Sequence, residues 1–422
     1  MESKPEPPPL PYRANQHPIA TPTSDGESLS SYGLFGCLPL EIRQQILTET
    51  FGNKVLHISL SLDHPLVVIP KKGSASWFTS DEPGLEVELH RDARQPKDWS
   101  WFGCVCRRPH IRHDGNPEIW KSAVEPWEDD CVPGTLILGR RAKRGAPDPD
   151  ACYPYHSESL IRVMSWLLAC RQAYMDGTQV LYSTNTFHMG DLILIRNLPD
   201  LMPSHHLAAM TSLELVWDFA RDDQNNSNAG VTMRSIWDAA AAAKPSSTST
   251  SAPSQPSTAF HHLCRMVPST FPNLRRLYIA LQAFLVPPED FPLADYDDDL
   301  LGAVERVVLA PIEDLFRALG PARGKDFSLA IQHGGWRVFA DRLTLEKGGK
   351  GKENRERDPR AFRCFEVVAM GERSFREKLW KPLGDGEHEG YWLCPGWDDF
   401  ALFGHSYWLF DIWRTGDIGG VF

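Results

Sequence analysis

The sequence predicts an α/β protein that contains an array of mostly parallel strands. Short strand-like runs at residues 185–189, 212–217, 274–281 and 327–331 each follow a helical or loop stretch. Phe187 and Leu215 lie 28 residues apart, and Leu215 and Tyr278 lie 63 apart, of which 37 belong to a low-complexity insertion. Because a helix that returns between two such strands makes them parallel, this spacing favours a repeated strand–helix unit.

Two of these runs have similar sequences. Residues 210–215 and 271–279 both place large aliphatic side chains at alternate positions, so that one face of each strand points inward. The pattern is typical of an irregular leucine-rich-type array, and an open α/β sheet without solenoid curvature is the alternative. The spacing leaves both architectures open.

The first helix is predicted at residues 38–51. Pro39 lies in its first turn, where the missing N–H costs nothing, and Gly52 ends it. Residues 55–60 alternate apolar and polar side chains and predict a strand. The folded region is therefore predicted to begin with a helix that is followed by a strand.

The strongest helical pattern covers Ser159–Tyr182. Val163, Leu167, Cys170 and Tyr174 recur at a spacing of three to four residues. These four side chains are predicted to form the buried face of one continuous helix.

Three segments are predicted to stay outside the core. Residues 1–30 are rich in Pro, Ser and Thr and predict a disordered tail. Residues 222–258 form a low-complexity insertion, broken only by a short helical pattern, and residues 346–360 form a charged, glycine-rich loop. The remaining chain, residues 31–422, is predicted to fold as a single α/β domain.

Composition argues against several classes of function. Hydrophobic residues make up 42% of the chain and charged residues 23%, as in an ordinary globular protein. The net charge of −11 argues against binding to nucleic acids or anionic membranes, which require a positive field. Nine scattered cysteines suit a reducing compartment, and no apolar run is long enough for a signal peptide core or a membrane helix. We expect an intracellular protein of the cytoplasm or nucleus.

The sequence holds no recognisable catalytic motif. Metal-capable residues gather at Cys104, Cys106, His110 and His113, but structural zinc sites normally use a Cys-x2-4-Cys spacing. No phosphate-binding loop, metalloprotease motif or dinucleotide fingerprint is present. The sequence therefore predicts no catalytic residue, no cofactor and no metal site.

Two blocks of sequence resemble a known family. Residues 36–47 contain Leu-Pro-Leu-Glu-Ile-Arg, residues 167–174 contain Cys-Arg-Gln-Ala-Tyr, and residues 180–187 contain Leu-Tyr-Ser-Thr-Asn-Thr-Phe. Residues 36–47 form the first block, and residues 167–174 and 180–187 together form the second; the two blocks resemble a large group of fungal F-box-like proteins of unknown function. The family's usual Glu-Ala after the tyrosine is Asp176-Gly177 here. The resemblance implies F-box-like elements at residues 36–52 and 159–187, joined to the α/β array.

The resemblance also implies a partner and a docking site. An F-box helix that opens with Leu-Pro docks on the adaptor of a cullin ubiquitin ligase. The residues that match this role here are Leu38, Pro39, Ile42 and Ile46.

A helical wheel gives two interpretations of this helix. Leu38, Ile42 and Ile46 form one apolar stripe, and Leu40, Leu47 and Phe51 form another on nearly the opposite side. A helix that is apolar on two sides is either buried on both within its own protein or exposes one side to a partner. The strand that follows directly favours burial on both sides.

These observations predict a non-enzymatic protein–protein interaction protein, either an F-box-like substrate adaptor or a degenerate relative. The partner is unknown, with a ubiquitin-ligase adaptor as the candidate, and binding to nucleic acids or membranes is not expected. The alternative is an enzyme or ligand-binding protein whose site is built from residues 65–157.

Overall fold

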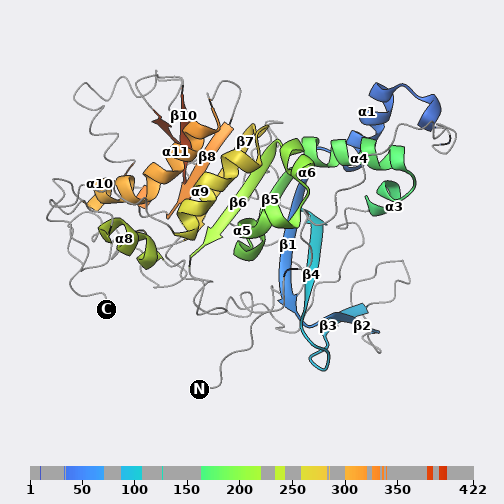
Figure 1. Cartoon of the computed structure of the whole chain (residues 1–422), viewed down its shortest axis with the longest axis horizontal. Helices are drawn as coiled ribbons and strands as arrows, with labels where there is room; N and C mark the ends of the chain where they lie inside the picture. Colours follow the sequence, from blue (N-terminus) through green and yellow to red (C-terminus); the bar gives the residue numbers. More distant parts are fainter. Residues whose placement is uncertain are drawn as a thin grey trace, which may run out of the picture. The chain divides into compact units, whose positions relative to one another are not determined.

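A computed structural model describes residues 35–70, 87–106, 163–219, 233–242, 258–282, 300–320, 326–332, 378–383 and 389–396, with a few single positions between them. Figure 1 shows the elements. The helices are α1 (Leu40–Phe51), α3 (Met164–Leu167), α4 (Arg171–Thr184), α5 (Leu192–Leu201), α6 (Ser204–Ala209), α8 (Met233–Ala242), α9 (Ala259–Thr270), α10 (Leu300–Val304), the π-helical turn η7 (Glu305–Leu309) and α11 (Ala310–Ala318). The strands are β1 (Val55–Asp63), β2 (Leu66–Pro70), β3 (Val87–Arg91), β4 (Asp98–Val105), β5 (Thr186–Met189), β6 (Ser212–Asp218), β7 (Arg276–Gln282), β8 (Asp326–Ile331), β9 (Leu379–Pro382) and β10 (Gly390–Pro395).

The chain divides into two compact units, one up to Ala209 and one from Met210 onward, apart from short exchanges around residues 125–128. Both combine helices with strands, so the predicted α/β class is confirmed, and most strands run parallel to a neighbour. A single domain over residues 31–422 stays a prediction. No helix in the described part of the chain is long and apolar enough to cross a membrane.

In the first unit, β1 lies between β4 and β5. It pairs antiparallel with β4 and parallel with β5, where Leu56 is opposite Phe187. A helix precedes each of the two parallel strands, α1 before β1 and α4 before β5. The predicted strand at residues 55–60 is therefore confirmed, and it extends to Asp63.

In the second unit, β6, β7, β8 and β10 lie side by side in chain order and parallel, and β9 adds an antiparallel edge. The helices α9 and α11 cross one face of these strands (Figure 1). Aromatic contacts join the two layers: the ring of Phe316 stacks on that of Phe327 at 5.0 Å, and Trp217 contacts Phe260. The strands predicted from residues 212–217, 274–281 and 327–331 are confirmed, and their alternate leucines form this core.

The sequence predicts that the insertion at residues 222–258 stays outside the core. The structure differs from this prediction in part of the segment. Its helix α8 places Ile236 and Trp237 among the fully buried side chains of the second unit. The composition of the segment is polar, but two adjacent large apolar residues on one helix are enough to anchor it. The prediction was wrong for α8.

The helix predicted over Ser159–Tyr182 is broken. It divides into α3 and α4, and Cys170 between them has an extended backbone and caps α4: its sulfur accepts the Ala173 N–H at 3.4 Å. Gly177 explains how the two helices pack, because a Cβ there would lie 2.6 Å from Leu167 Cδ2 and 2.9 Å from Trp166 Cδ1. A glycine weakens a helix by about 1 kcal/mol relative to alanine. Here the missing Cβ allows α3 to approach α4 closely.

Some predictions fall outside the described residues. These are the tail at residues 1–30, the charged loop at residues 346–360, and most of the segment 65–157, apart from β2, β3, β4 and the residues beside them.

Candidate functional site

The two blocks that carry the family resemblance pack against each other in the first unit. Leu47 and Phe51 of α1 are buried, and Arg43 reaches α4. Its Nε lies 2.9 Å from Asp176 Oδ2, with both side chains largely buried, and Gln172 Nε2 donates to the other carboxylate oxygen at 2.7 Å. The Asp176-Gly177 pair thus contacts two neighbours of α4, since Asp176 binds Arg43 of α1 and Gly177 leaves room for Leu167 and Trp166 of α3.

Asn185 ties the ends of the two helices together. Its Oδ1 accepts the Lys54 N–H at 2.8 Å, and its Nδ2 donates to the carbonyls of Phe51 and Leu181, each at 2.9 Å. The side chain is fully buried. Gly52 lies at the same junction, where a Cβ would be 2.6 Å from Thr184 Oγ1. The asparagine of the Leu-Tyr-x-x-Asn-x-Phe block therefore fixes how α1 and β1 join α4 and β5.

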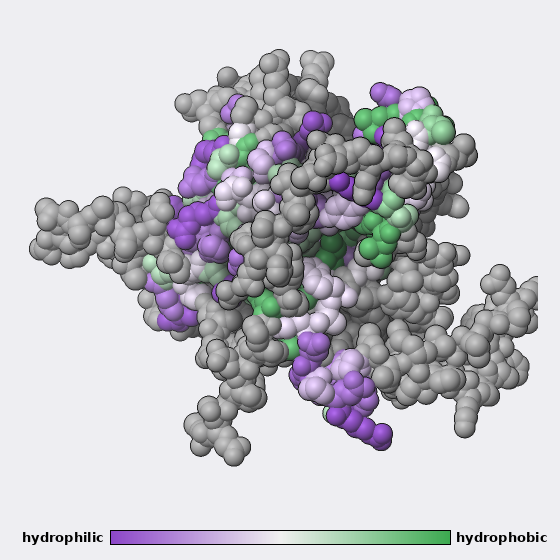
Figure 2. Space-filling model, turned by 45° about the vertical axis from the view of Figure 1, so that its right-hand side comes forward, coloured by the Kyte–Doolittle hydropathy of each residue, from purple (hydrophilic) through white to green (hydrophobic). Residues whose placement is uncertain are grey.

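With that side held inward, the opposite side of α1 faces out. Ile42 is 43% exposed and Ile46 is 38% exposed, and Leu40 in the first turn is 45% exposed. Figure 2 shows hydrophobic surface, in green, at the upper right of the view, where α1 lies. The expectation that α1 is buried on both sides was wrong, because α4 covers only the side that carries Leu47 and Phe51.

The other two predicted partner-binding residues lie just before α1. Pro39 is exposed and occupies the N-cap position instead of the first turn, and Leu38 is partly buried. The Leu38 carbonyl accepts a hydrogen bond from an Arg43 guanidinium nitrogen at 3.2 Å. Leu40 was expected on the inner stripe, and it is exposed at the start of the helix. We call the side of α1 that carries Ile42 and Ile46 the outer face of α1.

The remaining residues of the second block hold α4 against α6. The Tyr174 hydroxyl lies 3.2 Å from His206 Nε2, and the Tyr182 ring stacks on the His206 ring at 4.5 Å and on Phe187 at 5.5 Å. His206 itself is buried. The family-like tyrosines and phenylalanine thus have packing roles, and His206 is their partner, which the sequence did not single out.

The burial of His206 should make the stability of the folded chain depend on pH. Burial, followed by the charge of His205, lowers the pKa of His206 from 6.5 to about 4. Between these values the unfolded chain binds the proton and the folded chain does not, so stability falls as the pH drops from about 6.5 to about 4. The loss should be about 1–3 kcal/mol, measured by urea unfolding at several pH values.

The control for this prediction is His206→Gln, which cannot take up the proton. Its unfolding free energy should vary less with pH than that of the wild type over the same range. Identical pH dependence in the two proteins would contradict the assignment.

The candidate metal ligands are only partly described. Cys104 and Cys106 are buried, and Cys104 pairs in register with His57, which pairs with His188, so the three occupy one row across β4, β1 and β5. The two imidazole centroids lie 4.4 Å apart. Nowhere in the described residues do three His, Cys, Asp or Glu side chains form a group that could hold a metal ion. His110 and His113 lie outside the described residues, and the absence of a metal stays a prediction.

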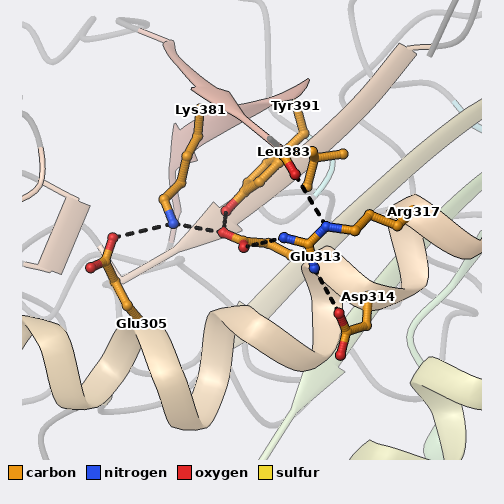
Figure 3. Close-up of polar contacts among 7 residues, drawn as sticks. All are labelled: Glu305, Glu313, Asp314, Arg317, Lys381, Leu383 and Tyr391. Carbon is orange, nitrogen blue, oxygen red and sulfur yellow. Dashed lines mark hydrogen bonds and ion pairs between the residues drawn. The ribbon is translucent and has the colours of Figure 1, made fainter. Parts of the chain in front are cut away.

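A second polar cluster lies in the second unit, between α11 and the β9–β10 hairpin (Figure 3). Lys381 Nζ lies 2.6 Å from Glu313 Oε1 and 3.2 Å from Glu305 Oε1. The Tyr391 hydroxyl donates to Glu313 Oε1 at 3.1 Å, and Arg317 binds the other Glu313 oxygen at 3.2 Å. Burial, followed by the charge of Glu313, raises the pKa of Tyr391 well above its usual range, which keeps the hydroxyl protonated as a donor.

The π-helical turn η7 explains how Lys381 meets both carboxylates. In a regular α-helix, residues eight positions apart point about 80° away from each other. The wider turn at Glu305–Leu309 absorbs one residue, so Glu305 and Glu313 come to the same side. All groups in this cluster are engaged with one another, so its role is to fasten the hairpin to α11.

Comparison with protein families finds a match to a domain described as "Domain of unknown function (DUF7730)", over residues 141–307. No curated protein and no solved structure matches the chain significantly. The matched stretch includes α4, β5, β6 and β7 and leaves α1 outside. Over this stretch the chain is therefore similar to that domain of unknown function.

Proposed function

We propose that this chain is a non-enzymatic protein–protein interaction protein that binds its partner through the outer face of α1. The observation that carries the proposal is the exposure of Ile42 and Ile46 on one side of a helix whose other side is firmly held. Exposed aliphatic side chains grouped on one helix face are typical of docking surfaces. The F-box-like sequence of the same helix makes the adaptor of a cullin ubiquitin ligase the first candidate partner.

The support from α4 favours docking by a preformed helix. The buried Arg43–Asp176 pair and the three hydrogen bonds of Asn185 fix α1 before any partner arrives. A preorganised helix binds with a smaller loss of conformational entropy than a segment that folds on binding. We therefore assign the second F-box-like block the role of a support and α1 the role of the contact surface.

The test is binding of the purified chain to the recombinant adaptor. We expect Ile42→Ser with Ile46→Ser to abolish binding, because both side chains are lost from the contact surface. Met175→Ser, which changes an exposed apolar residue on α4, is the control and should bind as the wild type does. An adaptor that binds the double variant as tightly as the wild type would exclude this docking mode.

A further inference from the structure

The outer face of α1 also has a charge. Glu41 and Glu49 are exposed, and Glu49 follows Ile42 by seven residues, which places it on the same side of the helix. The cation within α1 is Arg43, and Asp176 of α4 binds it on the inner side. The outer face is therefore an aliphatic stripe beside two carboxylates, with no cation contributed by α1.

The net charge of the whole chain also favours a positively charged partner. The net charge of −11 creates a negative field that favours the approach of positively charged surfaces and opposes negatively charged ones. Oppositely charged rims increase association rates, whereas like charges across an interface cost several kcal/mol.

Self-association is disfavoured by the same charges. A symmetric contact between two copies through this face would bring Glu41 and Glu49 of each copy close to the same residues of the other. The aliphatic stripe is thus unsuited to a second copy of this chain.

We infer that the partner of α1 presents an apolar contact surface bordered by lysine or arginine side chains, which face Glu41 and Glu49. The inference rests on the proposed function, since it describes what docks on the same helix face. It goes beyond the proposed function by stating the chemistry that selects the partner.

Two synthetic amphipathic helical peptides test this inference. They share the same leucine face and differ only in the residues beside it, which are lysine in one and glutamate in the other. We expect the chain to bind the lysine peptide at least about tenfold more tightly, with a difference that shrinks at high salt. Glu41→Lys with Glu49→Lys should reverse the preference.

Matched variants distinguish a failure of the inferred charge preference from a failure of the proposed function. Asp200→Lys with Glu389→Lys changes the net charge equally at two exposed sites outside α1, and it should keep the preference for the lysine peptide. If this control also reverses the preference, if neither peptide binds, or if the glutamate peptide binds equally well, the inference is wrong. If the Ile42→Ser, Ile46→Ser variant binds the lysine peptide as the wild type does, α1 is not the contact surface and the proposed function fails.

Discussion

Asn185→Leu should lower the free energy of unfolding by about 3–6 kcal/mol. The substitution keeps the branched shape and the number of heavy atoms but leaves the Lys54 N–H and the carbonyls of Phe51 and Leu181 without this hydrogen-bond partner. Each buried backbone group without a hydrogen bond costs about 1–3 kcal/mol. Urea unfolding of the wild type and the variant measures the difference.

The matched control is Asn197→Leu. Asn197 also bonds a backbone carbonyl, that of Ile193 at 2.7 Å, but it does so at the surface of α5, where water replaces the lost contact. This change should cost less than about 0.5 kcal/mol. Similar losses for the two variants would contradict the role of Asn185 as the junction of α1, β1, α4 and β5.

Trp237→Ala should lower the free energy of unfolding by about 3–5 kcal/mol, as truncation of a buried aromatic residue usually does. Trp237 is fully buried although it lies in the insertion at residues 222–258. Replacement of that whole segment by a short Gly-Ser linker should therefore destabilise the second unit instead of being tolerated. Thermal unfolding followed by circular dichroism measures both changes.

Arg234→Ala on the same helix is the control for this prediction. Arg234 and its partner Asp238 are both about half exposed, and such surface pairs contribute little. A well-folded deletion protein with the melting temperature of the wild type would show that α8 is dispensable.

Much of the fold could be predicted from the sequence, because it depends on local patterns. Alternate leucines such as Leu213 and Leu215 identified strands β6, β7 and β8 within one or two residues. The end of α1 was also predictable, because glycine directly after an apolar helical pattern is a typical helix stop and Gly52 is the C-cap. These features require only the neighbours of a residue along the chain.

The rest depended on contacts that no local pattern reveals. The spacing of apolar residues continues at three to four positions from Leu167 through Cys170 to Tyr174. The break before α4 does not interrupt this spacing, so the sequence pattern does not reveal it. Lys381 and Glu313 are 68 residues apart in the chain, and their contact depends on a π-helical turn.

The candidate site was predicted only in part. The wheel placed Ile42 and Ile46 on one side of α1 and Leu47 and Phe51 on the other, as found. It did not reveal which side was covered. The ion pair between Arg43 and Asp176 determines which side is covered, because it holds the side of α1 that carries Arg43 against α4.

The most direct measurement of the central claim compares the unfolding free energies of two double variants of α1. Ile42→Ser with Ile46→Ser changes the outer face and should cost about 1 kcal/mol or less, because both side chains already contact water. Leu47→Ser with Phe51→Ser changes the inner side and should cost more than about 5 kcal/mol, because two buried side chains are truncated and two hydroxyls are buried. Equal losses would mean that α1 is covered on both sides and has no free face to offer a partner.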